Sequence, residues 1–318
     1  MIDLAALEAA AKVVYAAMLP TPQYLWPLLS ARAGREVWVK HENHTPTGAF
    51  KVRGGLNLVA ALAQSTPRIA GIISATRGNH GQSLAYAARR YGMPCTIVVP
   101  HGNSRDKNNA MRALGAALIE HGRDFDEARE HAGTLAQQRV LRFVGPFEPE
   151  LVAGVGTYAL ELFRAVPDLD TVFVPIGCGS GICGLIAARD ALRLGTRIVG
   201  VVSANANAYA QSFRQRKRIE TATAITLADG MAVRVPVQAA LDTIWRGAHD
   251  VIEVTDAEVE AAMRAYYDDT HQVAEGAGAA PLAALLQDPA RAGGKTALIL
   301  GGGNVDRDLY ARVIGERH

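Results

Sequence analysis

The chain has 318 residues, of which 49% are hydrophobic and 20% are charged, an ordinary globular composition that argues against a disordered protein. Its formal net charge of +2 leaves no basic excess that could neutralise phosphates, which argues against a dedicated nucleic-acid binder. At about 150 residues per domain, the length predicts roughly two domains.

Short apolar runs alternate with longer amphipathic stretches along the whole chain. In chain order, the runs predict strands at Glu36–Lys40, Gly71–Ser74, Cys95–Val99, Ala116–Ile119, Thr171–Pro175, Ile198–Val202, Val251–Val254 and Ala297–Leu300. The stretches between them predict helices at Val52–Gln64, Gln82–Tyr91, Lys107–Leu114, Asp124–Gln138, Gly156–Ala165, Ile182–Leu194, Asp256–Thr270 and Pro281–Leu286. Thr255 and Glu258 match a capping box at the start of one helix. Alternating strands and helices are typical of parallel sheets covered on both faces, so we expect two α/β layers that share one cleft.

Two uncharged stretches resemble membrane spans, but both are interrupted. Residues 13–31 contain Pro20, Pro22 and Pro27, which we expect to break a helix there. Residues 171–188 contain four glycines and Pro175. The sequence therefore predicts no membrane partner.

The termini and the cysteines indicate the compartment. Acidic residues near the start of the chain and the lack of a basic segment predict no signal peptide. The three cysteines, Cys95, Cys178 and Cys183, form no CxxC pair and cannot make a disulfide framework. These features fit a reducing environment, so we expect a cytoplasmic protein.

The first segment with chemical features runs from Glu42 to Gly55 and contains Lys51. A lone lysine usually lies on the surface, but this one follows a predicted strand and a Pro/Gly turn, at the sheet edge where α/β sites collect. The small residues Gly48, Ala49, Gly54 and Gly55 allow close approach of a flat ligand.

The second segment, Ser74–Gln82, connects an apolar strand to an amphipathic helix. Backbone N–H groups in such a turn, with a helix N-terminus behind them, can bind an anion, and Asn79 can donate to a further oxygen. A helix cap in which Asn79 or His80 satisfies the free amides explains the segment equally well.

The third segment, Pro175–Gly184, has glycines at 179, 181 and 184 in GxGxxG spacing, which is typical of a dinucleotide site. That fingerprint requires an acid for the ribose about 20 residues later, yet the strand Ile198–Val202 is followed by Ser-Ala-Asn-Ala-Asn. A single phosphate fits this loop better than a dinucleotide.

The fourth segment, Leu298–Asp306, is again a strand that ends in glycines. A tight strand-to-helix turn would also need these glycines. Together, one lysine and two or three anion-binding turns at one sheet edge suit an aldehyde cofactor with a phosphate, namely pyridoxal 5'-phosphate. Lys51 would form the Schiff base and the glycine loop would hold the phosphate.

The motifs TGAFKVRG, RGNHGQ, GCGSG and GGGNVD, in this order and over nearly the whole chain, resemble those of the serine/threonine dehydratase family. The resemblance implies the tryptophan-synthase-β type of pyridoxal-phosphate fold, fold type II, with two open-sheet α/β domains and an active-site cleft between them. It implies a large cofactor-binding domain at 1–62 and 149–318 and a small mobile domain at 63–148. It also implies a homodimer, to which the apolar N-terminal segment would contribute.

The same resemblance assigns roles to individual residues. It implies that Lys51 is the catalytic lysine bound to the cofactor and that Phe50 lies beside the ring. Asn79 would bond the cofactor's phenolic oxygen, and Glu275 would lie near the cofactor. The phosphate would be cradled by Gly177, Cys178, Gly179, Ser180 and Gly181, and the substrate carboxylate by Thr76, Arg77, Gly78, Asn79 and His80. Arg129 falls near the position of a carboxylate-binding arginine in some members.

Four departures from the family pattern carry further expectations. Arg77 replaces a serine that racemases use as an acid/base, which weakens a racemase interpretation. Gly301 replaces the hydroxyl partner of the ring nitrogen, so we expect an unprotonated nitrogen unless another group substitutes. The carboxylates of metal-dependent members fall on Val202 and Ala208, so we expect no magnesium site. Since only a short stretch follows the last motif, we expect no C-terminal regulatory domain.

The resemblance implies a dehydratase that converts an L-β-hydroxy-α-amino acid to a 2-oxo acid and ammonia by β-elimination of water. L-Threonine and L-serine are the default substrates, and an aryl analogue such as L-phenylserine is an alternative because the residues at 77 and 301 are altered. An amino-acid racemase, a β-replacement synthase, a nucleotide-binding oxidoreductase and a non-catalytic relative remain alternatives.

Overall fold

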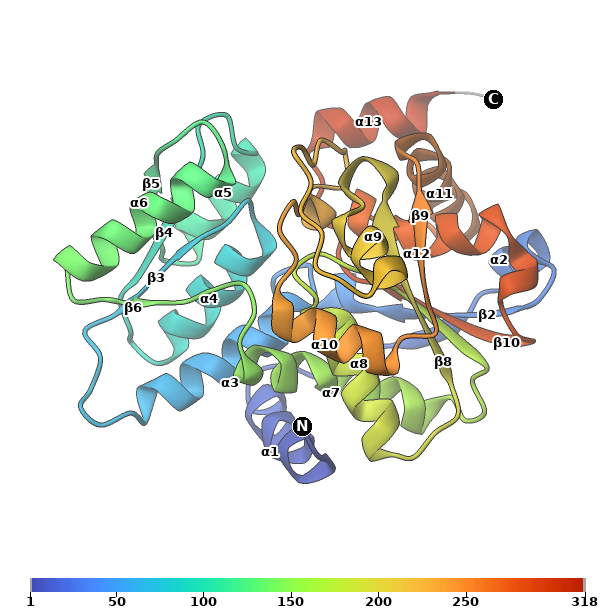
Figure 1. Cartoon of the computed structure of the whole chain (residues 1–318), viewed down its shortest axis with the longest axis horizontal. Helices are drawn as coiled ribbons and strands as arrows, with labels where there is room; N and C mark the ends of the chain where they lie inside the picture. The colour runs from blue at the N-terminus through green and yellow to red at the C-terminus, as the bar shows by residue number, and fades with distance from the viewer. Residues whose placement is uncertain (1, 317–318) are drawn as a thin grey trace.

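In the computed structural model, which describes residues 2–316, the strands form two separate sheets that lie side by side (Figure 1). The larger sheet has the strand order β1-β2-β10-β7-β8-β9 and the smaller one β5-β4-β3-β6. All neighbouring strands are parallel except β1 and β2, which are antiparallel. The predicted α/β class with two sheets is confirmed.

The strands of the larger sheet are β1 (Gln23–Leu25), β2 (Glu36–His41), β10 (Lys295–Leu300), β7 (Thr171–Pro175), β8 (Arg197–Ser203) and β9 (Asp250–Val254). Those of the smaller sheet are β5 (Ala117–Glu120), β4 (Cys95–Val99), β3 (Ile72–Ala75) and β6 (Arg142–Phe143).

Helices cover both faces of the larger sheet because successive side chains of its strands point to opposite faces. In β7, Val172 and Val174 join one core and Phe173 joins the other. The first core includes α1 (Leu4–Tyr15), α7 (Pro149–Ala165), α8 (Ser180–Ala191), α9 (Ala208–Gln215) and α10 (Gln238–Gly247). The second includes α2 (Pro27–Ala33), α11 (Asp256–Thr270), α12 (Gly276–Gln287) and α13 (Arg307–Gly315).

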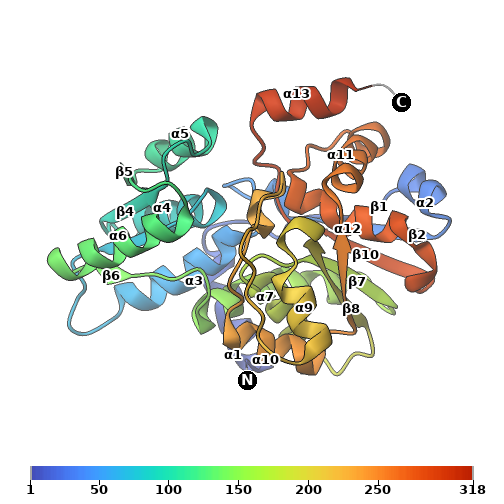
Figure 2. The same cartoon turned by 45° about the horizontal axis from the view of Figure 1, so that its top comes forward.

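The smaller sheet is covered in the same way. Ile72 of β3 packs in the core that contains α3 (Lys51–Ala63), α4 (Asn79–Arg90) and α5 (Arg105–Ala113). Ile73 packs on the opposite face against α6 (Phe125–Gln138). Figure 2 shows α3 running between the two sheets, where it packs on α4 and on α7. All four strands of this sheet lie within residues 63–148, and the division of the chain into domains at these residues stays a prediction.

All eight predicted strands are present within two residues of their predicted bounds, and the capping box of Thr255 and Glu258 is formed. Sequence analysis missed β1 and β6, which have only three and two residues. It also missed α1, α2, α9, α10 and α13. The expected interruption of residues 13–31 is confirmed, because α1 ends at Tyr15 and β1 lies between it and α2; Pro27 itself is the first residue of α2, where a missing N–H costs nothing.

Two predicted helices begin at least five residues earlier than expected, because glycines that suggest a break instead allow close packing. Helix α7 begins at Pro149 rather than Gly156; a Cβ on Gly154 would lie 2.4 Å from the carbonyl oxygen of Arg53, so α7 and α3 cross in close contact. Helix α12 begins at Gly276 rather than Pro281, and a Cβ on Gly278 would lie 2.5 Å from the carbonyl oxygen of Gly302.

Candidate active site

The four sequence motifs meet because each follows the carboxyl end of a parallel strand: β2, β3, β7 or β10. One cavity brings together nearly all the predicted site residues: Phe50, Lys51, Thr76, Arg77, Gly78, Asn79, His80, Gly177, Cys178, Gly179, Ser180, Gly181 and Glu275. Gly301 is not among the residues that line it. Gly301 lies behind Phe50 instead, where its carbonyl oxygen accepts a hydrogen bond of 2.9 Å from the Phe50 amide.

Lys51 is the first residue of α3, and its ammonium faces the loop that precedes α8. Its Nζ donates to the Ser180 hydroxyl at 3.0 Å and lies 5.1 Å from the centre of the Phe50 ring. Burial lowers the pKa of Lys51, because the charged form is poorly solvated there. A lysine with a lowered pKa can serve as a base and as a nucleophile.

The turn between β3 and α4 lines the cavity and leads into the N-terminus of α4. The Thr76 hydroxyl accepts a hydrogen bond of 3.0 Å from the Gly78 amide. Burial, together with the charge of Lys51, lowers the pKa of His80 to about 3, so the imidazole is neutral at physiological pH. The buried His80 Nε2 has no hydrogen-bond partner. Arg77 lines the cavity but is exposed to solvent.

The loop Gly177–Gly181 has a backbone shape that requires glycine at two positions. A Cβ on Gly177 would lie 2.2 Å from the carbonyl oxygen of Gly230, and Gly179 has a φ of +98°. The first-turn amides of α8 have no carbonyl partner within the helix and therefore suit an anion. Burial raises the pKa of the Cys178 thiol, which keeps it protonated.

Glu275 is a buried carboxyl group that is only partly hydrogen-bonded. Its Oε1 accepts a hydrogen bond of 2.8 Å from Asn79 Nδ2, whereas its Oε2 has no partner. Burial raises its pKa to about 7, against the lowering effect of the nearby Lys107 charge. The side chain of Asn79 is held from the other side by Asn304 Nδ2, which donates to Asn79 Oδ1 at 2.9 Å.

Sequence analysis missed two charged residues of the cavity, Lys107 and Asp229. Lys107 comes from α5 beside the smaller sheet, and its ammonium forms an ion pair with Asp229, in the segment between α9 and α10. A Cβ on Gly78 would lie 2.4 Å from Lys107 Cδ, so the lysine stem packs directly on the β3–α4 turn. No local pattern distinguishes Lys107 from a surface lysine, because its burial depends on contacts distant in sequence.

A second cavity adjoins the first and shares six lining residues with it: Arg77, Phe125, Pro146, Cys178, Ala232 and Val233. Its other walls include Val235 and Val237. Arg129 lines only this second cavity, where it pairs with Asp126 at 3.2 Å. Of the residues predicted to bind the substrate carboxylate, only Arg77 lines this second cavity with Arg129, so a role of Arg129 toward the carboxylate stays a prediction.

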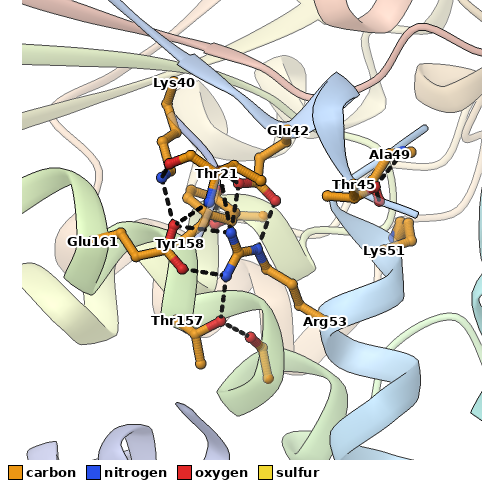
Figure 3. A network of polar contacts seen from close by, with 12 residues as sticks. Thr21, Lys40, Glu42, Thr45, Ala49, Lys51, Arg53, Thr157, Tyr158 and Glu161 are labelled. Carbon is orange, nitrogen blue, oxygen red and sulfur yellow. Dashed lines mark hydrogen bonds and ion pairs between the residues drawn. The ribbon is translucent and has the colours of Figure 1, made fainter. Parts of the chain in front are cut away.

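Behind Lys51 lies a buried set of four charged residues, Lys40, Glu42, Arg53 and Glu161, which we call the Arg53 network (Figure 3). Arg53 Nε donates to Glu42 at 2.7 Å and Nη1 donates to Glu161 at 2.6 Å. Lys40 Nζ donates to Glu161 at 2.5 Å. Because Glu42 follows β2 and Arg53 lies in the first turn of α3, their ion pair joins the two ends of the loop that carries Lys51.

Within residues 2–316, no group of three or more His, Cys, Asp or Glu side chains is arranged to hold a metal ion. Val202 and Ala208, the two positions at which the family resemblance predicts no metal-binding carboxylate, are buried apolar residues. No helix in the described part of the chain is long and apolar enough to cross a membrane.

Comparison with known proteins gives a consistent result. The family model described as pyridoxal-phosphate dependent enzyme matches residues 14–302. The chain is 35% identical over 290 residues to an L-threonine ammonia-lyase of Thermotoga maritima, covering 91% of this chain and 72% of that relative. Among solved structures, threonine deaminase isoform 2 of Solanum lycopersicum superimposes with a TM-score of 0.91 and 28% identity, covering 98% of this chain and 87% of the other. A pyridoxal 5'-phosphate-dependent aspartate racemase gives a TM-score of 0.91 and 28% identity, with coverages of 96% and 97%.

Proposed function

This chain belongs to the pyridoxal-phosphate dependent enzymes, as a member of the serine/threonine dehydratase type with fold type II, and we propose that it dehydrates L-threonine and L-serine. The products would be the 2-oxo acid and ammonia. The observation that carries the proposal is the hydrogen bond of 3.0 Å from Lys51 Nζ to Ser180 Oγ, which joins the reactive lysine to the start of an anion-binding helix.

The cavity fits pyridoxal phosphate. The glycine loop and the first turn of α8 form a cradle for a phosphate group, which a Cβ at Gly177 would disrupt. Of the two lysines that line the cavity, Lys107 is paired with Asp229, which leaves Lys51 for the aldehyde. Asn79 Nδ2 retains a second hydrogen that can be donated to the phenolic oxygen. The unpartnered Glu275 Oε2 and His80 Nε2 mark a wall suited to a polar ligand. From its position behind Phe50, Gly301 offers no hydroxyl to a ring nitrogen.

When bound, pyridoxal phosphate supplies an electron-withdrawing ring that stabilises negative charge at the substrate Cα. The chain's own residues supply the proton transfers. Burial lowers the pKa of Lys51, so its neutral amine can take the Cα proton. The same group, now an ammonium, can donate a proton to the departing hydroxyl, which leaves as water rather than as hydroxide. Ser180 orients this amine through their hydrogen bond.

The β3–α4 turn is proposed to hold the substrate carboxylate. The turn lies at the N-terminus of α4, which favours negative charge. The amides of Thr76 and Gly78 already donate to the Val98 carbonyl and to the Thr76 hydroxyl, so the carboxylate would bind the other amides of the turn. Because its imidazole is neutral at physiological pH, His80 adds no positive charge at this position.

The test of the cofactor assignment is visible absorption of the purified holoenzyme before and after borohydride. We expect a yellow band that bleaches and a reduced adduct that maps to Lys51. Lys51→Ala should lower 2-oxo acid formation by at least about a thousandfold, because it removes the base and the covalent link together. Normal product formation by this variant would refute the assignment, and Lys295→Ala, far from the cavity, serves as the matched control.

An aryl substrate such as L-phenylserine is the second candidate, favoured by the second cavity. Phe125, Pro146 and Val233 line both cavities and would contact a large β-substituent. The measurement is kcat/KM for L-threonine, L-serine and L-phenylserine. A strong preference for threonine would remove the aryl candidate, whereas a strong preference for phenylserine would assign the second cavity to the substrate side chain.

Product analysis distinguishes dehydration from the other activities considered for this fold. A racemase would form D-serine from L-serine, and a β-replacement synthase would consume serine only with a second nucleophile. The exposed side chain of Arg77 offers no acid/base group in place of the racemase serine. The nucleotide-binding interpretation of the glycines at 179–184 gives way to a phosphate site, because the family match covers this loop.

We also propose a cytoplasmic homodimer that acts on a small amino-acid substrate, with neither nucleic acid nor membrane as a partner. Apolar side chains of the N-terminal segment are exposed, with Leu19 at 83% and Leu28 at 59%, and they offer a surface for a second copy. Sedimentation of the holoenzyme would give a mass near twice that of the chain. A monomer at micromolar concentration would refute the dimer.

A further inference from the structure

The side-chain amide of Asn79 can take two orientations that differ by exchange of its nitrogen and oxygen. Only one of them directs N–H groups toward Glu275 and toward the place proposed for the cofactor's phenolic oxygen. The sequence motif RGNHGQ does not decide between them, since the choice depends on what surrounds the amide.

Asn304, from the fourth motif, determines which of the two orientations the Asn79 amide takes. Its Nδ2 donates to two oxygens, the backbone carbonyl of Thr47 at 2.8 Å and Asn79 Oδ1 at 2.9 Å. A backbone carbonyl can only accept, so the nitrogen of Asn304 must face Thr47. Asn79 must then present its oxygen to Asn304, and its nitrogen therefore points the other way, toward Glu275 Oε1 at 2.8 Å.

The position of Asn304 is fixed by the loop that carries Lys51. The Gly303 amide donates to the carbonyl oxygen of Gly48 at 2.9 Å, which joins the two loops. Gly48 has a φ of +68°, and a Cβ there would lie 2.6 Å from Asn304 Oδ1. The space that Asn304 occupies thus depends on a glycine at 48, which explains one small residue of the TGAFKVRG motif.

We propose that Asn304 is a positioning residue that fixes the amide of Asn79 with its N–H groups toward Glu275 and the cofactor's phenolic oxygen. The inference rests on the role proposed above for Asn79 and is independent of which amino acid the enzyme dehydrates. It assigns the GGGNVD motif a role that does not involve the ring nitrogen.

The test uses the holoenzyme without substrate and follows the pH midpoint of its visible absorbance. A donor to the phenolic oxygen favours the ionised form, so loss of the donor raises the midpoint. Asn304→Asp, which replaces the donor with a carboxylate, should raise it by about one unit, as expected for one hydrogen bond to a charged group. It should also weaken pyridoxal phosphate binding about tenfold, which is about 1.4 kcal/mol. Asn304→Ser removes the amide without adding charge and should move both quantities in the same direction.

A double-mutant cycle distinguishes positioning from a structural role. If Asn304 acts through Asn79, Asn79→Ala and the pair Asn79→Ala with Asn304→Ser should have the same midpoint. Additive shifts, or a wild-type midpoint in Asn304→Ser, would overturn the inference. An unchanged midpoint in Asn79→Ala would instead overturn the role of Asn79, and the inference with it. Asn57→Asp loses a comparable amide bond, of 2.8 Å to the Glu150 carbonyl outside the cleft, and serves as the control that keeps the wild-type midpoint.

Discussion

Two clusters of buried charge lie on either side of Lys51, and they differ in how completely they are hydrogen-bonded. In the Arg53 network every charged group has a partner of opposite charge, and none of its residues lines the cavity. On the cavity wall, a second set comprises Asn79, Lys107, Asp229 and Glu275, which we call the cleft cluster. There, Glu275 Oε2 has no partner although it is buried.

This difference in hydrogen bonding indicates different roles: the Arg53 network stabilises the fold, and the cleft cluster is available to bind a ligand. Burying a charge costs several kcal/mol unless it is paired, so a fully paired network holds elements together and offers nothing to a ligand. A buried polar atom without a partner is uncommon in a folded protein and is explained here by a ligand that would complete it. Three variants sharpen this comparison.

The largest effect on stability is expected for a substitution in the Arg53 network. Arg53→Met leaves Glu42 and Glu161 buried with less positive charge, and we expect the free energy of unfolding to fall by about 3–5 kcal/mol. Urea denaturation of the apoprotein measures this. Arg123→Met breaks an exposed ion pair with Glu127 and should leave the free energy of unfolding almost unchanged, because water screens that pair. Equal effects of the two variants would contradict the comparison.

The second expected effect is on the pH dependence of stability, through Glu275 of the cleft cluster. Burial raises the pKa of Glu275 to about 7 from its ordinary 4.5, so between these pH values the folded protein holds a proton that the unfolded chain releases. This carboxyl therefore stabilises the fold most below pH 4.5, and its contribution falls as pH rises through 7. The loss amounts to about 3 kcal/mol.

Glu275→Gln removes this titration. The difference in unfolding free energy between the wild-type and variant apoproteins should fall by that amount from pH 4.5 to pH 7.5. Parallel pH profiles for the two proteins would show that Glu275 does not titrate in this range.

The smallest effect on stability is expected for a substitution of Lys107. Lys107→Met should lower stability by only about 1 kcal/mol, because its partner Asp229 is one-third exposed and can be hydrated. Since the Lys107 stem packs on Gly78, the carboxylate-binding turn should loosen, and KM for the amino acid should rise about tenfold. Steady-state kinetics measures this, and Lys107→Arg, which keeps the charge, should recover much of the affinity. A fall in kcat at constant KM would point to a different role.

Much of the fold could be predicted because its signals are local. The apolar runs of β3, β4 and β7 are four or five residues long and fully or almost fully buried, and this pattern is typical of central parallel strands. The missed elements depend on tertiary contacts. Strand β1 is a three-residue edge strand whose existence depends on pairing with β2, and the early start of α7 depends on glycines that pack against α3.

The candidate site divides in the same way. Lys51, Asn79 and the loop Gly177–Gly181 could be found because strand ends, glycines and a lysine mark them within short segments. Lys107 and Asp229 could not be found, because they lie 122 positions apart and meet only when the two sheets are placed side by side. No local pattern marks Arg129, whose position in the second cavity beside Arg77 depends on how α6 packs on the smaller sheet, and its role toward the substrate carboxylate stays a prediction.

The sequence by itself determined the chemical groups of this protein: one lysine after a strand, a glycine loop for a phosphate, and four ordered motifs of one family. These are local because each depends on backbone conformation over a few residues. Only the tertiary structure decided which charges are fully paired and which face the cavity, and how the amide of Asn79 is oriented. Those properties depend on partners more than a hundred residues away, and on burial, which changes the cost of every unpaired charge.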